Sequence, residues 1–445
     1  MIMKKLMSLV SLFVGVLLCT NLFAEADKLV VISPHKKSIQ DEFVSRFEKY
    51  YKEKFGKEVK VDWLYQGGTS SDLKFVKAKY EQNPKTSGID VFWGGGGTVL
   101  YELSKSNLLT PMKLSKEALK GIPEKISGVT VFNKERTWIA TGLSSFGVFY
   151  NKPLLKMKGI PEPKKWSDLA DPRYNGLITG ADPRKSGSAA TSNLVVVNAL
   201  GWAKGFEVLA PIFANSSKIN NNSSDSIKDV VSGAAAATFA IDFYAFSKIA
   251  ELGSGNLGYV LPEGETVVDP DPIGILKGAP NPTVATRFVE FVISKDAQKV
   301  MILPRDSKGG PTMSFIGKMA VNKLAYDETE GRYMVINPFK SKSNYKTSDY
   351  EKDVERLKVL NDYIGTVFVD SHRSLRKAWN NILSVGITPA LIGELSVPPV
   401  GEKEFYSYNA KWSDNVFRNK KINEWTSYAD KKYSKLASLK AEKKK

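Results

Sequence analysis

Residues 89–103, IDVFWGGGGTVLYEL, predict a buried strand, a glycine loop and a helix in direct succession. The strand covers residues 89–93, which are apolar except for Asp90. Four glycines follow at 94–97, and residues 98–103 have apolar side chains at helical spacing. A strand that leads through a polar loop into a helix is the repeating unit of α/β proteins.

Two earlier segments repeat this pattern. Residues 29–32 form a β-branched run that is followed by a turn and by a helix with Phe43 and Phe47 on one face, which Gly56 can end. Residues 59–64 predict a second strand, and the loop 66–70 leads into a helix that carries Val76. Three such units predict a parallel sheet whose loops meet at one edge, where ligands bind at helix N-termini.

The rest of the chain predicts a second lobe and a helical tail. Residues 138–150 and 267–276 are extended, and we interpret them as crossings between two lobes. The predicted division is a signal peptide at 1–24, a first lobe at 27–138 and 270–325, a second lobe at 139–269, and a helical C-terminal extension at 326–445 packing on the first lobe. Trp379, Trp412 and Trp425 are the expected packing anchors of the extension.

The N-terminus has the layout of a secretory signal peptide: Lys4 and Lys5, an apolar run at 6–18, and small residues around Ala24. The run is shorter than the roughly 20 apolar residues that span a bilayer. Cys19, the only cysteine, leaves open a lipid anchor, although Leu18 before it is larger than the residue usual there. We expect a periplasmic protein without disulfides or thiol chemistry.

The charge is strongly basic. The formal net charge is +17, and removal of residues 1–24, which hold two lysines and no acid, leaves +15 (17 − 2). Such a surface can attract nucleic acid, an anionic membrane or an anionic ligand. Export and the even scatter of the lysines argue against nucleic acid, and the lysines of the C-terminal tail are interpreted as solvated.

Seven stretches, in this order, resemble one known group of proteins. They are VISPH (31–35), QGGTS (66–70), DVFWGGG (90–96), FGVFYNK (146–152), ADPRKSGS (181–188), IDFYA (241–245) and DPIGILKGAP (271–280). Together they resemble the extracellular solute-binding proteins of the iron(III), polyamine and organophosphate import group. The resemblance implies a type II periplasmic-binding-protein fold, an α/β fold of two lobes joined by crossing strands.

The same resemblance implies a function: capture of a small solute in the cleft between the lobes and delivery to an inner-membrane ABC permease. It implies no enzyme activity, no cofactor, no nucleic-acid partner and a monomer. In similar ferric-iron binders a histidine, an acid and adjacent tyrosines hold the metal, a set that suits hard Fe(III). His35 and Tyr244 match that pattern, and the candidate acids are Asp242, Asp269 and Asp271. Glycine stands where the usual acid would be, and Ala245 replaces the second tyrosine.

A phosphate or phosphonate type of oxyanion is the rival ligand. Glycines and hydroxyls at 67–71, 94–98, 186–188 and 223–224 offer N–H groups and hydroxyls at helix starts. The same glycines can serve only as turns, and the serines only as N-caps. The predicted ligand-binding residues are Ser33, His35, Gly67, Gly68, Thr69, Ser70, Gly95, Gly96, Ser145, Ser186, Gly187, Ser188, Ser224, Asp242, Tyr244 and Asp271.

Two other classes of function were weighed. An exported enzyme would need catalytic machinery, and the sequence has no HExxH, GxSxG or Walker motif and only two histidines. A surface lipoprotein would depend on lipidation of Cys19. The binding protein is therefore the favoured hypothesis, with iron and oxyanion both open as its ligand.

Overall fold

The first lobe is built on the three predicted strand, loop and helix units. The structure, a computed structural model, describes residues 26–340 and 349–440, so the signal-peptide prediction and Cys19 lie outside it. The units are β1 (Asp27–Ile32), α2 (Lys37–Phe55), β2 (Val59–Leu64), α3 (Thr69–Gln82), β3 (Val91–Trp93) and α4 (Gly97–Lys105). Strand β1 pairs in parallel with both β2 and β3, which confirms the predicted sheet.

Local sequence explains where these helices lie. Helix α2 buries Phe43, Phe47 and Tyr51, which are spaced four residues apart and therefore share one face. Gly56 ends this helix in the left-handed conformation, with its N–H donating to the carbonyl of Lys52. The lobe is completed by β4 (Leu109–Thr110), β5 (Lys125–Ile126), β6 (Val129–Thr130), α10 (Pro282–Ile293), α11 (Lys295–Ile302), β13 (Met319–Ala320) and α12 (Lys323–Asp327).

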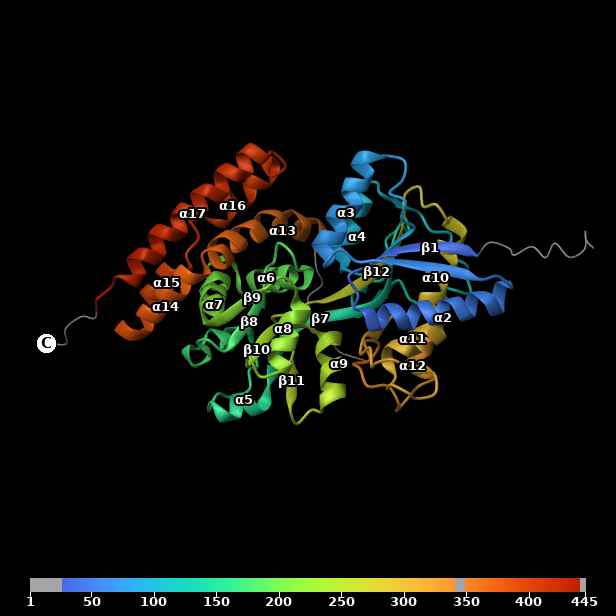
Figure 1. Cartoon of the computed structure of the whole chain (residues 1–445), viewed down its shortest axis with the longest axis horizontal. Helices are drawn as coiled ribbons and strands as arrows, with labels where there is room; N and C mark the ends of the chain where they lie inside the picture. The colour runs from blue at the N-terminus through green and yellow to red at the C-terminus, as the bar shows by residue number, and fades with distance from the viewer. Residues whose placement is uncertain (1–25, 341–348, 441–445) are drawn as a thin grey trace, which may run out of the picture.

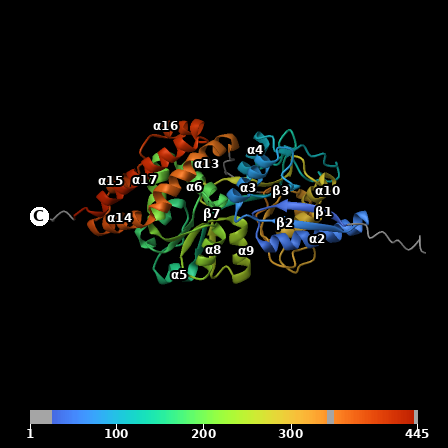
Figure 2. The same ribbon diagram turned by 45° about the horizontal axis from the view of Figure 1, so that its top comes forward.

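The second lobe is a separate α/β layer. Its sheet uses β8, β9 and β10, and helices cover both faces (Figures 1 and 2). Its elements are α5 (Lys152–Met157), η1 (Trp166–Ala170), η2 (Pro172–Tyr174), β8 (Ile178–Ala181), α6 (Gly187–Leu200), α7 (Trp202–Asn215), β9 (Ser216–Asn220), α8 (Ser223–Val231), β10 (Ala237–Ile241), α9 (Asp242–Leu252) and β11 (Leu257–Val260).

Two long buried strands join the lobes, as predicted. They are β7 (Ile139–Asn151) and β12 (Val268–Leu276), which pair antiparallel from Val268 opposite Ser145 to Ile273 opposite Ile139. The register shifts between Asp271 and Pro272. Strand β7 then pairs with β10, so one path runs β2-β1-β3-β12-β7-β10-β8-β9 through both lobes. On this path, among the described strands, the pairing of β12 with β7 links the part of the sheet in the first lobe to the part in the second. We call these two strands the hinge.

The C-terminal helices pack on the second lobe, so the prediction that they pack on the first is wrong (Figure 1). Residues up to Phe339 still pack on the first lobe. The helices beyond are α13 (Tyr350–Ile364), η3 (Gly365–Asp370), α14 (His372–Val385), α15 (Pro389–Ser396), α16 (Glu402–Ser407), η4 (Tyr408–Lys411) and α17 (Asn415–Ala437), which together we name the extension.

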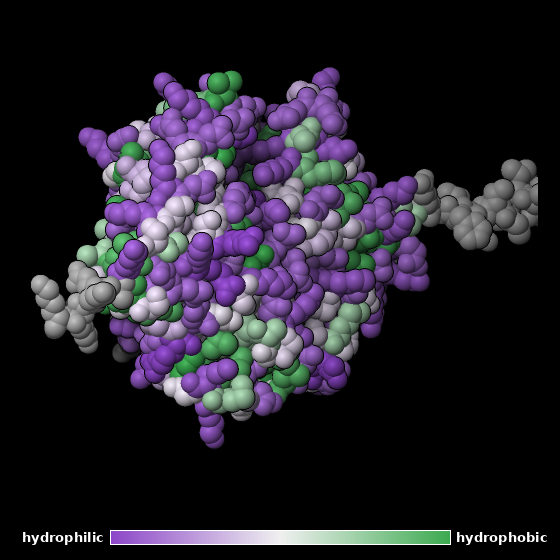
Figure 3. Space-filling model, turned by 60° about the vertical axis from the view of Figure 1, so that its left-hand side comes forward, coloured by the Kyte–Doolittle hydropathy of each residue, from purple (hydrophilic) through white to green (hydrophobic). Residues whose placement is uncertain are grey.

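The physical reason for this packing is helix α7, which has apolar side chains on more than one face and therefore needs more than one neighbouring element to bury them. Phe206 of α7 is fully buried and lies 5.5 Å, ring to ring, from Tyr363 of the extension. Trp379, Trp412 and Trp425 are all buried, which confirms them as packing anchors. The outer face that the extension presents is mostly hydrophilic (Figure 3). No helix in the described part of the chain is long and apolar enough to cross a membrane.

One helix of the extension touches both lobes. Helix α13 packs on α6 of the second lobe and also meets α4 of the first lobe, and both views show it beside these helices (Figures 1 and 2). The extension is otherwise anchored to the second lobe, because its aromatic side chains share one core with α7. Helix α13 therefore bridges the two lobes at the edge of the gap between them.

Candidate functional site

A cavity of about 80 Å³ lies between the lobes. A single water needs ~10–15 Å³ on this measure, so the cavity suits a small solute. Helix starts and loops of the first lobe, the hinge strands and helix starts of the second lobe all contribute to its wall. The described wall consists of Pro34, His35, Tyr65, Gly68, Thr69, Gly95, Gly96, Gly97, Thr98, Ser144, Phe146, Ser186, Gly187, Ser188, Thr191, Asn222, Ser223, Ser224, Ile241, Phe243, Tyr244, Asp269, Pro270 and Asp271.

The lobes are closed around this cavity. A Cβ built on Gly187 would lie 2.7 Å from the Cβ of Thr69, and one built on Gly68 would lie 3.1 Å from the carbonyl oxygen of Lys185. These contacts join α3 of the first lobe to the start of α6 in the second. Glycine at these positions is what lets the two lobes approach so closely.

The structure brings most of the predicted site residues to the cavity. Eleven of the sixteen line it: His35, Gly68, Thr69, Gly95, Gly96, Ser186, Gly187, Ser188, Ser224, Tyr244 and Asp271. Ser33, Gly67, Ser70, Ser145 and Asp242 are not among the described residues of its wall. Ser33 instead supports His35, since its hydroxyl lies 3.0 Å from Nδ1 of the imidazole and accepts from the His35 N–H.

His35 is held rigidly against the glycine loop of β3. A Cβ on Gly94 would lie 2.8 Å from Cε1 of the imidazole, so only glycine leaves room for the ring. The ring also contacts Trp93 edge to face, with centroids 5.0 Å apart. His35 is 3% exposed, and burial, with the nearby charge of Lys318, lowers its pKa. The imidazole is therefore neutral at physiological pH.

Two helices of the first lobe start at the cavity without a side-chain cap. Helix α3 begins after Gly68 and α4 after Gly96, and no described side chain accepts a hydrogen bond from their first turns as a cap. Both glycines have positive φ, 142° and 86°, which turns the chain sharply into the helix. The first N–H groups of a helix lack partners within it and carry the positive end of its dipole. These starts are suited to bind an anion.

The second lobe presents hydroxyl groups on two helix starts. Ser186 caps α6, and its hydroxyl lies 2.7 Å from that of Ser223 at the start of α8. Asn222 caps α8 by accepting from the Asp225 N–H. Ser188 and Ser224 also line the cavity. The second lobe thus faces the cavity with small polar groups that donate and accept hydrogen bonds.

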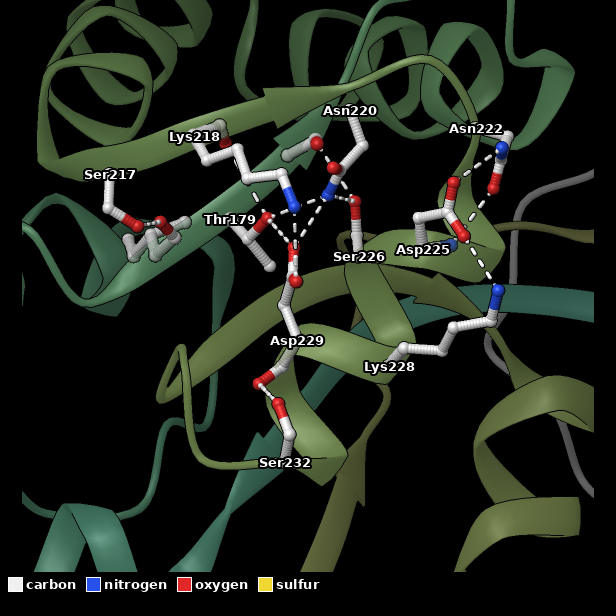
Figure 4. Close-up of polar contacts among 12 residues, drawn as sticks. Thr179, Ser217, Lys218, Asn220, Asn222, Asp225, Ser226, Lys228, Asp229 and Ser232 are labelled. Atoms are coloured by element: carbon white, nitrogen blue, oxygen red, sulfur yellow. Dashed lines mark hydrogen bonds and ion pairs between the residues drawn. The ribbon is translucent and has the colours of Figure 1, made fainter.

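A polar network fixes α8 beneath its sheet. The side-chain amide of Asn220 donates to Asp229, at 2.7 Å, and the hydroxyl of Thr179 donates to the same carboxylate oxygen, at 3.0 Å (Figure 4). Ser226 in turn donates to the carbonyl oxygen of Gly180, at 2.8 Å. Figure 4 shows these side chains, from β8, β9 and α8, pointing toward one another. The network sets the position at which the start of α8 meets the cavity.

The floor of the cavity contains a buried charge cluster. Lys318 Nζ contacts the carboxylate of Asp271 and lies 3.1 Å from Nε2 of His35, which is itself 2.9 Å from Asp271. Burial alone would raise the pKa of Asp271, but the charge of Lys318 and the contact with His35 hold it well below its usual value. Asp271 is therefore an ionised carboxylate whose charge the lysine ammonium neutralises.

The three residues predicted for iron do not form a common set in this arrangement. Asp242 lies in the second lobe, where its carboxylate accepts from the N–H and hydroxyl of Ser145 and from the N–H of Phe243. Burial raises the pKa of Asp242 to about 7. Burial likewise raises the pKa of Tyr244. Within residues 26–340 and 349–440, no group of three or more His, Cys, Asp or Glu is placed to hold a metal.

Several residues at the site were not predicted. Tyr65, Ser144, Thr191 and Phe243 line the cavity, and Lys318 supports its floor. Asn222 also escaped the prediction, although asparagine before a helix is a typical N-cap and could have indicated it. Ser144 is 3% exposed, and its hydroxyl has no hydrogen-bond partner in the part of the chain that the structure covers.

Comparisons with known proteins agree with this fold. The sequence pattern of the family described as bacterial extracellular solute-binding protein matches residues 44–313. A curated relative, the phosphoglycerate transport regulatory protein PgtC of Salmonella typhimurium, is 24% identical over 303 residues, which is 65% of this chain and 70% of the relative.

Two solved structures share the fold. The periplasmic binding protein AfuA from Actinobacillus pleuropneumoniae, with fructose-6-phosphate bound, has a TM-score of 0.59 at 22% identity, over 81% of this chain and 99% of AfuA. Iron-bound HitA from Pseudomonas aeruginosa has a TM-score of 0.57 at 19% identity, over 76% of this chain and 99% of HitA. The two-lobed fold is therefore that of periplasmic binding proteins, as predicted.

Proposed function

Because this chain belongs to the family of bacterial extracellular solute-binding proteins, which are binding proteins and not enzymes, we propose that its interlobe cleft captures a small oxyanion. The ligand is phosphate, a phosphonate or a small organic phosphate. The protein then delivers this ligand to an ABC permease of the inner membrane. Family membership supports the binding role, and the cleft supports the class of ligand.

The observation that carries the ligand class is the chemistry of the cavity wall. Two uncapped helix starts of the first lobe face the serine-rich helix starts of the second lobe across about 80 Å³. The described wall includes eight serine and threonine side chains: Thr69, Thr98, Ser144, Ser186, Ser188, Thr191, Ser223 and Ser224. The unpartnered hydroxyl of Ser144 is one donor that a ligand oxygen can satisfy. N–H groups at helix starts combined with hydroxyls are how proteins bind oxyanions.

Iron fits this wall less well than an oxyanion. A cation at the floor would lie beside the ammonium of Lys318, which already contacts both His35 and Asp271. Asp242 uses its carboxylate on Ser145 and Phe243. The basic character of the chain, +17, also favours attraction of an anion.

Periplasmic location is part of the proposal. It is supported by the signal-peptide features of residues 1–24 and by the extracellular family of the chain. A lipid anchor on Cys19 would keep the protein at the membrane surface near its permease. Mass spectrometry of the exported protein distinguishes the two forms, since lipidation adds diacylglycerol to a mature chain that begins at Cys19.

The ligand is tested by thermal unfolding of the protein against phosphate, phosphonates, hexose phosphates, ferric citrate and polyamines. A ligand that binds only the folded state stabilises it by RT ln(1 + [L]/Kd), or ~2.7 kcal/mol at a hundred times Kd. We expect at least one oxyanion to raise the melting temperature in a saturable manner with one site per chain.

Two results would contradict the proposal. The first is the absence of a shift with every oxyanion. The second is binding of ferric iron with a visible tyrosinate band that is lost in Tyr244→Phe, which would assign the cleft to iron instead.

A further inference from the structure

Lys318 reaches the floor of the cleft from a distant part of the chain. It comes just before β13, and its own N–H donates to the carbonyl oxygen of Met301 in the first lobe. Its aliphatic stem crosses β7 at Gly142, where an added Cβ would lie 2.9 Å from Cδ of the lysine. Glycine at 142 therefore leaves the passage through which the side chain runs.

The ammonium of Lys318 lies close to residues of the first lobe, of the hinge and of the second lobe. It contacts His35 of the first lobe and Asp271 of the hinge strand β12, and it lies 4.7 Å from the ring centroid of Phe243 in the second lobe. Lys318 is 2% exposed. A lysine buried to this degree is rare unless its charge is paired, and here Asp271 supplies the pair.

The charge of the floor depends on this lysine. Lys318 contributes +1, Asp271 contributes −1 and the buried imidazole of His35 is neutral, so the three sum to zero. Without the lysine the sum is −1. The charges of Asp269 on the wall and of Lys36 near Tyr244 are the same with and without Lys318, so they do not alter this difference.

The carboxylate of Asp271 also competes for the start of α4. Its Oδ1 lies 3.4 Å from the N–H of Gly96, the residue that precedes this helix, while Oδ2 is held by Lys318 and His35. A carboxylate without its lysine partner would be drawn to the same N–H groups that an oxyanion needs. Lys318 therefore acts on the ligand through Asp271, as a positioning residue.

We propose that Lys318 determines the ligand class of the cleft by holding and neutralising Asp271, so that the floor accepts an anion. This inference rests on the proposed function and names the residue that sets its specificity. It also explains why a hinge strand that carries two aspartates, Asp269 and Asp271, can border an anion site.

The test is a charge cycle on Lys318 and Asp271, with affinity for inorganic phosphate, and for whichever phosphate ester binds the unmodified protein, measured by calorimetric titration. Lys318→Met keeps the length of the stem without its charge and should weaken oxyanion binding at least tenfold. Lys318→Met/Asp271→Asn removes both charges and should return the affinity to within about threefold of the unmodified protein. Asp271→Asn alone should bind the oxyanion at least as tightly as the unmodified protein.

Recovery in the double variant alone does not exclude a purely structural role, because removal of both partners of a buried ion pair can also restore stability. A Lys318→Met variant that keeps the melting temperature of the unmodified protein but loses affinity is the result that a purely structural role would not produce. Lys36→Met is the control: it removes a half-buried lysine, which donates to Ser247 and does not contact Asp271, so Asp271→Asn should not compensate for it. The double variant and Asp271→Asn still decide the question if Lys318→Met fails to fold.

The outcomes separate the two proposals. If the unmodified protein binds an oxyanion and Lys318→Met binds it equally well, Lys318 does not set the ligand class. A double variant as weak as Lys318→Met, or an Asp271→Asn variant weaker than the unmodified protein, overturns the inference in the same way. If the unmodified protein binds no oxyanion, the proposed function itself fails.

Discussion

Gly94→Ala tests how tightly the glycine loop of β3 holds His35. Gly94 has φ 93°, and an added Cβ would lie 2.8 Å from Cε1 and 3.0 Å from Nε2 of the imidazole. Carbon atoms normally approach to ~3.5–4.0 Å, so the ring would have to retreat by roughly 0.7–1.2 Å. It has little room, because Trp93 and Asp271 contact it.

Gly96→Ala is the matched control for this change. Gly96 has nearly the same φ, 86°, but nothing lies within 4 Å of its built Cβ. Both variants therefore carry a backbone cost for a positive φ, ~1–3 kcal/mol. Only Gly94→Ala adds overpacking, which typically costs ~1–3 kcal/mol. We expect Gly94→Ala to be less stable than Gly96→Ala by that second amount.

The assay is thermal and urea unfolding of the ligand-free protein, followed by circular dichroism. The same pair is then compared in a His35→Ala background, where the ring is absent. The difference between the two glycine variants should vanish there, because double-mutant cycles isolate a direct contact. A difference that persists without the imidazole, or variants of equal stability in the original background, would refute the reasoning.

Three further predictions concern closure, the extension and pH. Gly187→Ala places a Cβ 2.7 Å from that of Thr69 across the closed lobes, so the closed state should become less favourable and oxyanion affinity, measured by titration, should fall ~5- to 100-fold; full affinity would argue against this closure contact. Phe206→Ala should cost ~3–5 kcal/mol in denaturant unfolding and expose the extension to protease, whereas a loss under about 1 kcal/mol would mean that the extension is not anchored on α7. Burial raises the pKa of Asp72 from 3.8 to about 7, so the folded state keeps a proton that the unfolded chain releases, and stability falls as pH rises through that window. Asp72→Asn keeps an acceptor for the Gln66 N–H and should flatten this slope in unfolding measured from about pH 4 to about pH 8; an unchanged slope would exclude Asp72 as its source.

Much of the fold was predictable because its signals are local. Strand, loop and helix alternate within residues 27–105, and each turn carries glycine or serine where the backbone requires it. The crossing strands β7 and β12 are buried along nearly their whole length, and such strands read as continuous apolar or small residues. The order of these elements leads directly to two lobes and to a cleft at the helix starts.

The packing of the extension was not predictable in this way. An amphipathic helix shows which of its faces is buried but not which partner buries it. Helix α14 packs on α7, which ends more than 150 residues earlier in the chain, and α17 packs on α14. The prediction placed the extension on the first lobe for lack of this long-range information.

Lys318 escaped prediction for a related reason. The sequence holds 64 lysines and arginines, and this one lies 47 residues from Asp271 and 283 from His35. Its only local signal is a run of apolar neighbours, Phe315, Ile316, Met319 and Ala320, in which a lone charge is unusual. Contacts between residues so far apart in the sequence form only in the folded chain, where the segments that carry His35, Asp271 and Lys318 meet at the hinge.

Helix α13 gives the molecule a natural place for an optical reporter of ligand capture. It packs on α6 of the second lobe and contacts α4 of the first lobe. Rotation about the two-strand hinge therefore changes the separation of α13 and α4, while α13 stays on the second lobe and α4 on the first. The only cysteine of the sequence is Cys19, which lies outside the described residues, so one new cysteine on the solvent side of each helix can carry a donor and an acceptor dye. Energy transfer between them would follow each opening and closing event, at a distance from the atoms that hold the ligand.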